Sequence, residues 1–219
     1  MKTVRKAILA ILCIAALVVA SVMGTLAYLT DTEEAVNTFT VGNVQIDLNE
    51  TDVDNNNNTK ANAYHLLPGQ TYTKDPTVTV EANSEESYIR MIVTVSNIAS
   101  LKEAFPVSPT DNRYTDWYDA GGNFLLQKLV SGWDSSKWEC VSINGNVYEF
   151  RYTSTVSTKD AEAKKLEPLF EKIVVPGTVN NTELAKLNEM EINVTAHAIQ
   201  AAGFGTADAA WTAFNTQHP

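Results

Sequence analysis

Three histidines are the residues of this 219-residue chain best suited to metal or acid–base chemistry, and they are dispersed as His65, His197 and His218. A zinc peptidase needs two histidines one helical turn apart with a glutamate as base, because both imidazoles must reach one metal ion. No HExxH occurs, so the histidines offer no frame for that chemistry. We expect His197, on a strand, to face solvent or a loop, and His218 to belong to a disordered tail.

Motifs for nucleophilic catalysis and phosphate binding are also missing from the sequence. It holds no GxSxG, no cysteine and histidine paired by spacing, and no glycine-rich phosphate loop, since Gly121 and Gly122 are typical of a turn. Cys13 lies in an apolar N-terminal run, which leaves Cys140 alone in the rest of the chain. We expect Cys140 to be buried as a small apolar residue, with pairing between two chains as the alternative. The sequence predicts no catalytic residues, no cofactor-binding residues and no enzyme activity.

One short segment is similar to a calcium-binding loop. Asp52, Asp54 and Asn56 follow the alternating spacing of an EF-hand. The pattern fails at its sixth position, where Asn57 replaces the required glycine, and at its twelfth, where Ala63 replaces the glutamate. We therefore expect at most weak calcium binding at this loop and no other metal site.

The N-terminus has the three parts of a secretory signal peptide. Its basic start is formed by Lys2, Arg5 and Lys6. An uncharged apolar run follows over residues 7–22, and the small residues Thr25 and Ala27 then mark a cleavage site between Ala27 and Tyr28. The alternative is an uncleaved membrane anchor, but the run is shorter than the roughly 20 residues that span a bilayer. We expect residues 1–27 to be removed, so that the membrane holds only the precursor.

The charge balance restricts the partners of the exported chain. The full sequence carries 16 basic and 26 acidic residues, and removal of residues 1–27 takes three basic residues and no acidic one, which leaves a net charge of −13. Nucleic-acid phosphates would repel such a chain, so we expect no nucleic-acid binding. The remaining length fits one domain.

Strand patterns dominate residues 44–219. Residues 44–48 and 191–199 alternate apolar and polar side chains with period two, and residues 77–80 and 88–95 are rich in β-branched side chains. Asn144 and Gly145 predict a type I′ hairpin between residues 138–143 and 147–152. The expected fold is all-β, an antiparallel β-sandwich of Greek-key or jelly-roll type.

Helices are expected only as short pieces in the connections. Residues 98–104 are long enough for about two turns, and residues 159–166 are rich in alanine, glutamate and lysine. Thr182 is placed to cap a helix over residues 183–189, and Thr206 to cap one over residues 207–214.

Two end segments resemble one family of exported proteins. The N-terminal segment reads AYLTDTE over residues 27–33 and NTFTVGNVQIDL over residues 37–48, and the C-terminal one reads INVTAHAIQAAGF over residues 192–204 followed by AAW at 209–211. They are similar to the start and the last core strand of the TasA/camelysin family of Gram-positive bacteria. LPG at 67–69 and YIRM at 88–91 fit the same order.

The resemblance implies a division of the chain and a function. A SipW-type signal peptidase would remove residues 1–27, residues 28–43 would form an assembly strand, and residues 44–219 a jelly-roll domain. The protein would then be a secreted subunit of a biofilm matrix or surface fibre, and each subunit would donate its N-terminal strand to the next. Tyr28 and Leu29 would anchor this strand, and Val36 and Phe39 are its further apolar residues.

Three alternatives remain open from the sequence. Camelysin-like members carry a metalloprotease label, which the dispersed histidines do not support. A monomeric surface adhesin or binding module is the second alternative, because the N-terminal motif could serve processing alone. In the third, residues 28–39 fold back on their own domain.

Overall fold

The computed structural model of the chain describes residues 30–33, 43–108, 112–188 and 190–218. Within these ranges the protein is mostly β, with its strands in three antiparallel sheets and short helices in the connections. The all-β, antiparallel part of the sequence prediction is therefore confirmed.

The five-stranded sheet has the order β1-β11-β5-β8-β7. Its strands are β1 (Thr30–Glu33), β5 (Ser87–Val95), β7 (Trp138–Asn144), β8 (Val147–Tyr152) and β11 (Ile192–Gln200). In β5 and β11 every second residue points to the main core, as the alternating sequence predicts. Their fully buried members on this face are Ile89, Met91, Val93, Val95, Ala196 and Ala198.

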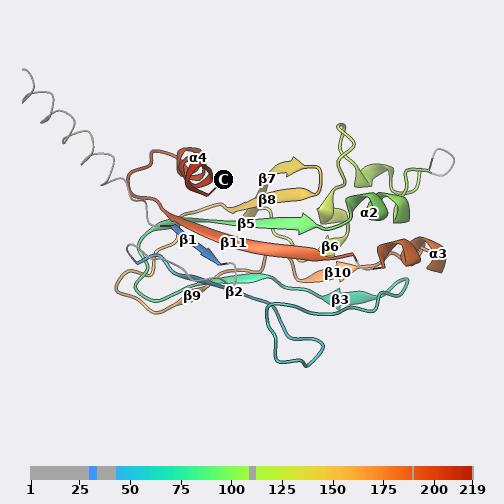
Figure 1. Cartoon of the computed structure of the whole chain (residues 1–219), viewed down its shortest axis with the longest axis horizontal. Coiled ribbons are helices and arrows are strands. Elements are labelled where there is room, and N and C mark those ends of the chain that lie inside the picture. Colours follow the sequence, from blue (N-terminus) through green and yellow to red (C-terminus); the bar gives the residue numbers. More distant parts are fainter. Residues whose placement is uncertain (1–29, 34–42, 109–111, 189, 219) are drawn as a thin grey trace, which may run out of the picture.

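Two three-stranded sheets complete the β structure. One has the order β2-β4-β9 and the other β3-β10-β6. Their strands are β2 (Ile46–Asn49), β3 (Thr71–Thr73), β4 (Thr77–Val80), β6 (Val130–Ser131), β9 (Lys164–Lys165) and β10 (Lys172–Val174). Buried side chains from all three sheets form one hydrophobic core, and β2 and β3 lie on the opposite side of β5 and β11 from helix α4 (Figure 1).

The described helices are short. They are α2 (Ile98–Ala104), α3 (Asn181–Leu184), α4 (Ala207–Gln217) and three 3₁₀ turns, η1 (Thr115–Trp117), η2 (Leu126–Lys128) and η3 (Ala185–Leu187). The expected helix at α2 is confirmed, and Thr206 caps α4 as predicted, by accepting a bond from the backbone N–H of Ala209. Across the described part of the chain, no helix combines the length and the apolar character needed to cross a membrane.

Two helix predictions are wrong. Asn180, not Thr182, is the cap before α3, because its side chain and that of Glu183 bond reciprocally to the backbone in a capping box. Residues 159–166 form no helix, and Lys164–Lys165 instead pair with β4 as strand β9. Pairing with a strand distant in sequence overrides the local helix propensity there.

The β7–β8 hairpin is confirmed, but its turn differs from the prediction. Asn144 pairs with Val147, so the central residues are Gly145 and Asn146. Gly145 has φ +62°, and Asn146 lacks a positive φ. A positive φ at the first central position alone is the pattern of a type II′ turn rather than type I′.

Strand β7 forms one outer edge of the five-stranded sheet. Its register with β8 shifts between Cys140 and Ser142, which marks a β-bulge. The opposite edge is formed by β1.

Candidate functional site

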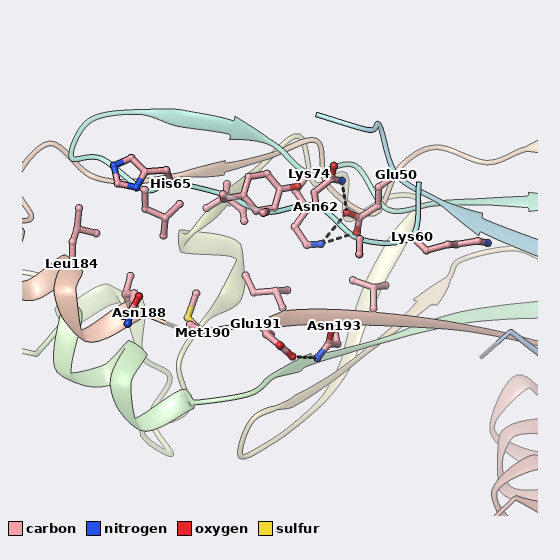
Figure 2. Close-up of a pocket in the computed structure, with 18 of the residues that line it drawn as sticks. Glu50, Lys60, Asn62, His65, Lys74, Leu184, Asn188, Met190, Glu191 and Asn193 are labelled. Atoms are coloured by element: carbon pink, nitrogen blue, oxygen red, sulfur yellow. Dashed lines mark hydrogen bonds and ion pairs between the residues drawn. The ribbon is translucent and has the colours of Figure 1, made fainter. Parts of the chain in front are cut away.

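A groove of about 1200 Å³ lies beside the first half of β11, and we call it the β11 groove. Residues 191–195 line it on one side, and residues 59–67, which form an arm without helix or strand before β3, line it on the other. Residues from α3 and η3 close one end, as Figure 2 shows.

A buried ion pair stands in the wall of the groove on the side of the arm. Lys74 Nζ donates to both carboxylate oxygens of Glu50, at 2.7 and 3.0 Å, and the two side chains are only 9% and 8% exposed. Asn62 is fixed beside this pair, because its amide donates to the Thr51 carbonyl at 2.9 Å and accepts from the Val53 N–H at 2.8 Å. Glu50, Asn62 and Lys74 therefore form a rigid polar group on this side (Figure 2).

Two tyrosines hold the arm in its extended course. Tyr64 donates its hydroxyl to the Thr73 carbonyl at 2.9 Å, and the Tyr72 hydroxyl accepts from the Leu67 N–H at 2.7 Å. Burial, followed by the nearby Glu50 carboxylate, raises the pKa of Tyr64, so this hydroxyl stays protonated as a donor. The arm is thus anchored to β3 at both tyrosines.

Most of the remaining lining is apolar. Its larger apolar side chains are Leu48, Leu66, Leu67, Ile173, Leu184, Leu187, Met190, Ile192 and Val194. Leu67 is 48% exposed at the rim of this lining. An apolar groove with a few fixed polar groups is typical of a binding site.

The β11 groove begins where β1 ends. Thr30–Glu33 pair with residues 196–199 of β11, and β5 pairs with β11 along its whole length on the other side. For Ile192–Thr195, the second edge of β11 has no strand partner in the described ranges. An uncovered strand edge offers N–H and C=O groups to another strand.

Histidine and cysteine are sparse in the described lining of the groove. His65 is exposed at its lining, with no second histidine and no cysteine among the residues that line it. Over all the described residues, no group of three or more histidine, cysteine or acidic side chains lies together as a metal site would require.

Several residues that the sequence singles out lie outside the described ranges. This holds for both residues of the expected cleavage site and for all four expected apolar residues of the assembly strand, namely Ala27, Tyr28, Leu29, Val36 and Phe39. Only Thr30–Glu33 of the expected strand segment 28–43 are described as a strand, and they pair with β11 of their own chain.

The calcium-like loop is closed by its own backbone. Asp52 accepts N–H groups from Asn56 and Asn57 at 3.3 and 2.8 Å, and Asp54 accepts them from Asn56 and Ala63 at 3.3 and 3.0 Å. A calcium ion would have to compete with these bonds for the two carboxylates. Weak calcium binding remains a prediction.

The expectation that His197 faces solvent or a loop is wrong. Its ring lies 4.9 Å from that of Phe214, beneath α4, and His218 packs on the same phenylalanine at 4.6 Å. Cys140 is half-buried rather than fully buried, and burial raises the pKa of its thiol.

The polar group of the groove was missed by sequence reasoning. Glu50 and Lys74 are 24 positions apart, and neither belongs to a recognisable motif. The one usable signal was the resemblance of the LPG segment at 67–69 to a family pattern, which points to the arm but not to its contacts.

Comparison of the chain with protein-family models, with curated proteins and with solved structures finds no match. The functional argument therefore starts from the groove, the strand edge and the N-terminal segment.

Proposed function

We propose that this chain is an exported, non-enzymatic subunit of an extracellular matrix or surface fibre, which assembles by donating its N-terminal strand to a neighbouring copy. One observation carries the proposal: among the described residues, β1 pairs with only half of the outer edge of β11, and the β11 groove continues along the other half. A strand donated by another subunit would satisfy such an edge and place alternate side chains in the groove.

The register of β1 supports this arrangement. Thr30 pairs with Ile199 and Glu33 with Ala196, so a donated strand that kept this register would place its Val36 opposite Asn193. Its Phe39 would lie opposite Met190, which lines the groove. The two positions are an odd number of residues apart, so their side chains would point to opposite faces of the donated strand, and Phe39, on the face of Met190, is the one that would enter the groove. Its burial there would contribute roughly 1.5–3 kcal/mol.

In the isolated subunit the same edge is occupied by the subunit's own β1. The contact of β1 with β11 is an edge pairing at the start of the chain, so it can be exchanged for an equivalent strand of a neighbour, as in domain swapping. Head-to-tail exchange does not close on itself and therefore propagates a filament.

The proposal also includes a jelly-roll arrangement of the three sheets and the export of the chain. The five-stranded sheet and the two small sheets would form the two layers of a jelly-roll sandwich, which their shared core supports. A SipW-type peptidase would release the chain after Ala27, so the mature protein would be extracellular and touch a membrane only as a precursor. Its acidic charge argues against nucleic acid as a partner.

A monomeric adhesin or binding module is a second candidate, favoured by the β11 groove itself. In that case an extended peptide of another protein would occupy the groove, and β1 would remain on its own domain. The two candidates differ in whether the purified protein forms filaments.

Electron microscopy of three preparations tests the proposal. Protein starting at Tyr28, verified by intact mass, should form filaments, and protein starting at Val44 should fold, as circular dichroism would show, yet stay monomeric. Replacing both Val36 and Phe39 by alanine should also prevent filaments, whereas Thr38→Ala, the matched control, should not. Filaments from the Val44 preparation would disprove strand donation, and a monomeric Tyr28 preparation would favour the binding module.

A further inference from the structure

Helix α4 packs on the outer face of the five-stranded sheet through a small hydrophobic cluster of its own. The cluster consists of Ile199, Ala210, Trp211 and Phe214, and it is separate from the main core. The indole N–H of Trp211 is buried and finds no acceptor among the described residues. This unpaired donor destabilises the docked state of α4, because in the released state it would donate a hydrogen bond to water. The docking of α4 therefore depends on few interactions.

Arg90 of β5 provides the polar part of this docking. Its guanidinium carbon lies 4.4 Å from the ring centre of Trp211 and 4.8 Å from that of Phe214. Its Nη2 donates to Asn215 Oδ1 at 2.8 Å, and Glu149 lies 3.7 Å from its Nη1. Two aromatic rings and one amide of α4 thus converge on one buried cation.

The contact between Arg90 and His197 fixes the protonation state of the histidine. Arg90 Nε donates to His197 Nδ1 at 3.1 Å. Arginine keeps its proton at all relevant pH values, so Nδ1 must present a lone pair and the imidazole must be neutral. A proton on Nδ1 would remove this hydrogen bond and place two cations in contact beneath Phe214.

The electrostatics around His197 agree with this geometry. Burial, then Arg90 and then His218 lower the pKa of His197 to about 4. An exposed histidine has a pKa near 6.5, so the released state of α4 takes up the proton more readily than the docked state. Arg90 is the cross-strand partner of His197 and stays beside it after release, so release removes the burial by α4 and the nearby His218, and acidification shifts the docking equilibrium toward release.

The other charged groups near His197 are few. Glu149 and Arg151 face the site from β8, and Arg151 also pairs with Asp208 in the first turn of α4. From β1, Thr32 is the register partner of His197, with Asp31 and Glu33 as its chain neighbours. Asp208 is 85% exposed, so its ion pair with Arg151 is screened by solvent and contributes little to docking.

We propose that α4 is an acid-released latch, which stays docked while His197 is neutral and leaves the sheet when His197 is protonated. The inference goes beyond the proposed assembly function and does not depend on it. Release would expose the aromatic face of α4 and the outer face of β5 and β11.

Hydrogen exchange of the purified protein between pH 7 and pH 4, corrected for the intrinsic pH dependence of exchange, tests the latch. The amides of α4 should lose protection through local release and exchange much faster than those of β5, whose protection follows the stability of the whole fold. In His197→Asn, the side-chain oxygen can accept from Arg90 without titrating, so α4 should stay protected at pH 4. Asp208→Asn, which removes only the exposed ion pair, should respond to acid like the parent protein.

Each contrary result overturns the proposal. One contrary result is an α4 that stays protected at pH 4, and another is an equal loss of protection in α4 and β5. A third is that α4 of His197→Asn loses protection with the same pH dependence as in the parent protein. The fourth is that Asp208→Asn no longer responds to acid. If His197→Asn does not fold, the proposal is tested by the titration midpoint of His197 in the parent protein, measured by NMR. A midpoint well below 6.5 is expected, and a midpoint at or above 6.5 contradicts the latch.

Discussion

Lys74 and Glu50 form an ion pair at 2.7 Å inside the wall of the β11 groove, with less than a tenth of either side chain exposed. The two charges have lost most of their hydration, so each depends on the other. The pair ties the end of β2 to the end of β3, because Glu50 directly follows β2 and Lys74 directly follows β3. The Glu50 N–H also donates to the Thr59 carbonyl at 2.8 Å, which fixes the start of the 59–67 arm beside this pair.

We expect Glu50→Gln to destabilise the fold by about 3–5 kcal/mol, because it leaves the Lys74 ammonium buried without its counterion. Urea unfolding measures the change. The control is Asp116→Asn, which removes the partner of Lys128 in an exposed pair and should cost far less, because solvent screens that pair. Equal effects of the two substitutions would contradict the importance of burial.

Gly132 is expected to tolerate alanine poorly. It has φ +81°, and a Cβ there would lie 2.5 Å from Glu171 Cγ and 2.7 Å from Glu171 Cβ. The backbone strain of about 1–2 kcal/mol would thus be joined by a clash of about 1–3 kcal/mol. Gly122 shares the conformation, with φ +76°, but has no heavy atom within 4 Å of such a Cβ, so Gly122→Ala should show the strain alone in thermal unfolding.

His197 should make the stability of the fold decrease with acidification. Its pKa is about 4 in the folded protein and near 6.5 in the unfolded chain, so the unfolded state binds more protons between these values. Its contribution is complete above pH 6.5 and is lost as the pH falls toward 4, by about 2–3 kcal/mol. Subtracting the urea-unfolding profile of His197→Asn from that of the parent isolates this term, and a flat difference would contradict it.

Homogeneous mature protein should hydrolyse no peptide bonds, with or without added Zn²⁺. The reason is the dispersal of the histidines, among which only His65 lines the groove. A protease assay on a mixed peptide library measures this. Activity that copurifies with the protein and disappears in His65→Ala would refute the prediction and restore the peptidase alternative.

The sequence predicts the strands better than the site. The β-branched content of residues 88–95 locates β5, and the period-two alternation of residues 191–199 locates β11, each to within one residue of the strand's bounds. The helix prediction for residues 159–166 is wrong because a contact with a distant strand outweighs the local propensity. The Ala, Glu and Lys content of this segment favours helix locally, but Leu166 is 3% exposed and its N–H bonds to the Val78 carbonyl.

The groove could not be predicted, since it is built by contacts between residues far apart in the chain. Nothing near Glu50 shows that Lys74 will neutralise it, and nothing near His197 shows that Arg90 and α4 will cover it. The alternation in β11 assigns His197 to the correct face of the strand, but the helix that covers this face begins ten residues later.

Under the proposed strand donation, the bulge in β7 has a consequence for the five-stranded sheet, because it disfavours a second connection at that edge. A bulged and twisted edge pairs poorly with a further strand, so the sheet is open to extension on the β11 side only. In the terms of polymer chemistry, a subunit with one donor strand and one acceptor edge is a bifunctional monomer. Such monomers form linear, unbranched chains, and a subunit that lacks its donor strand but keeps its acceptor edge would act as a chain stopper.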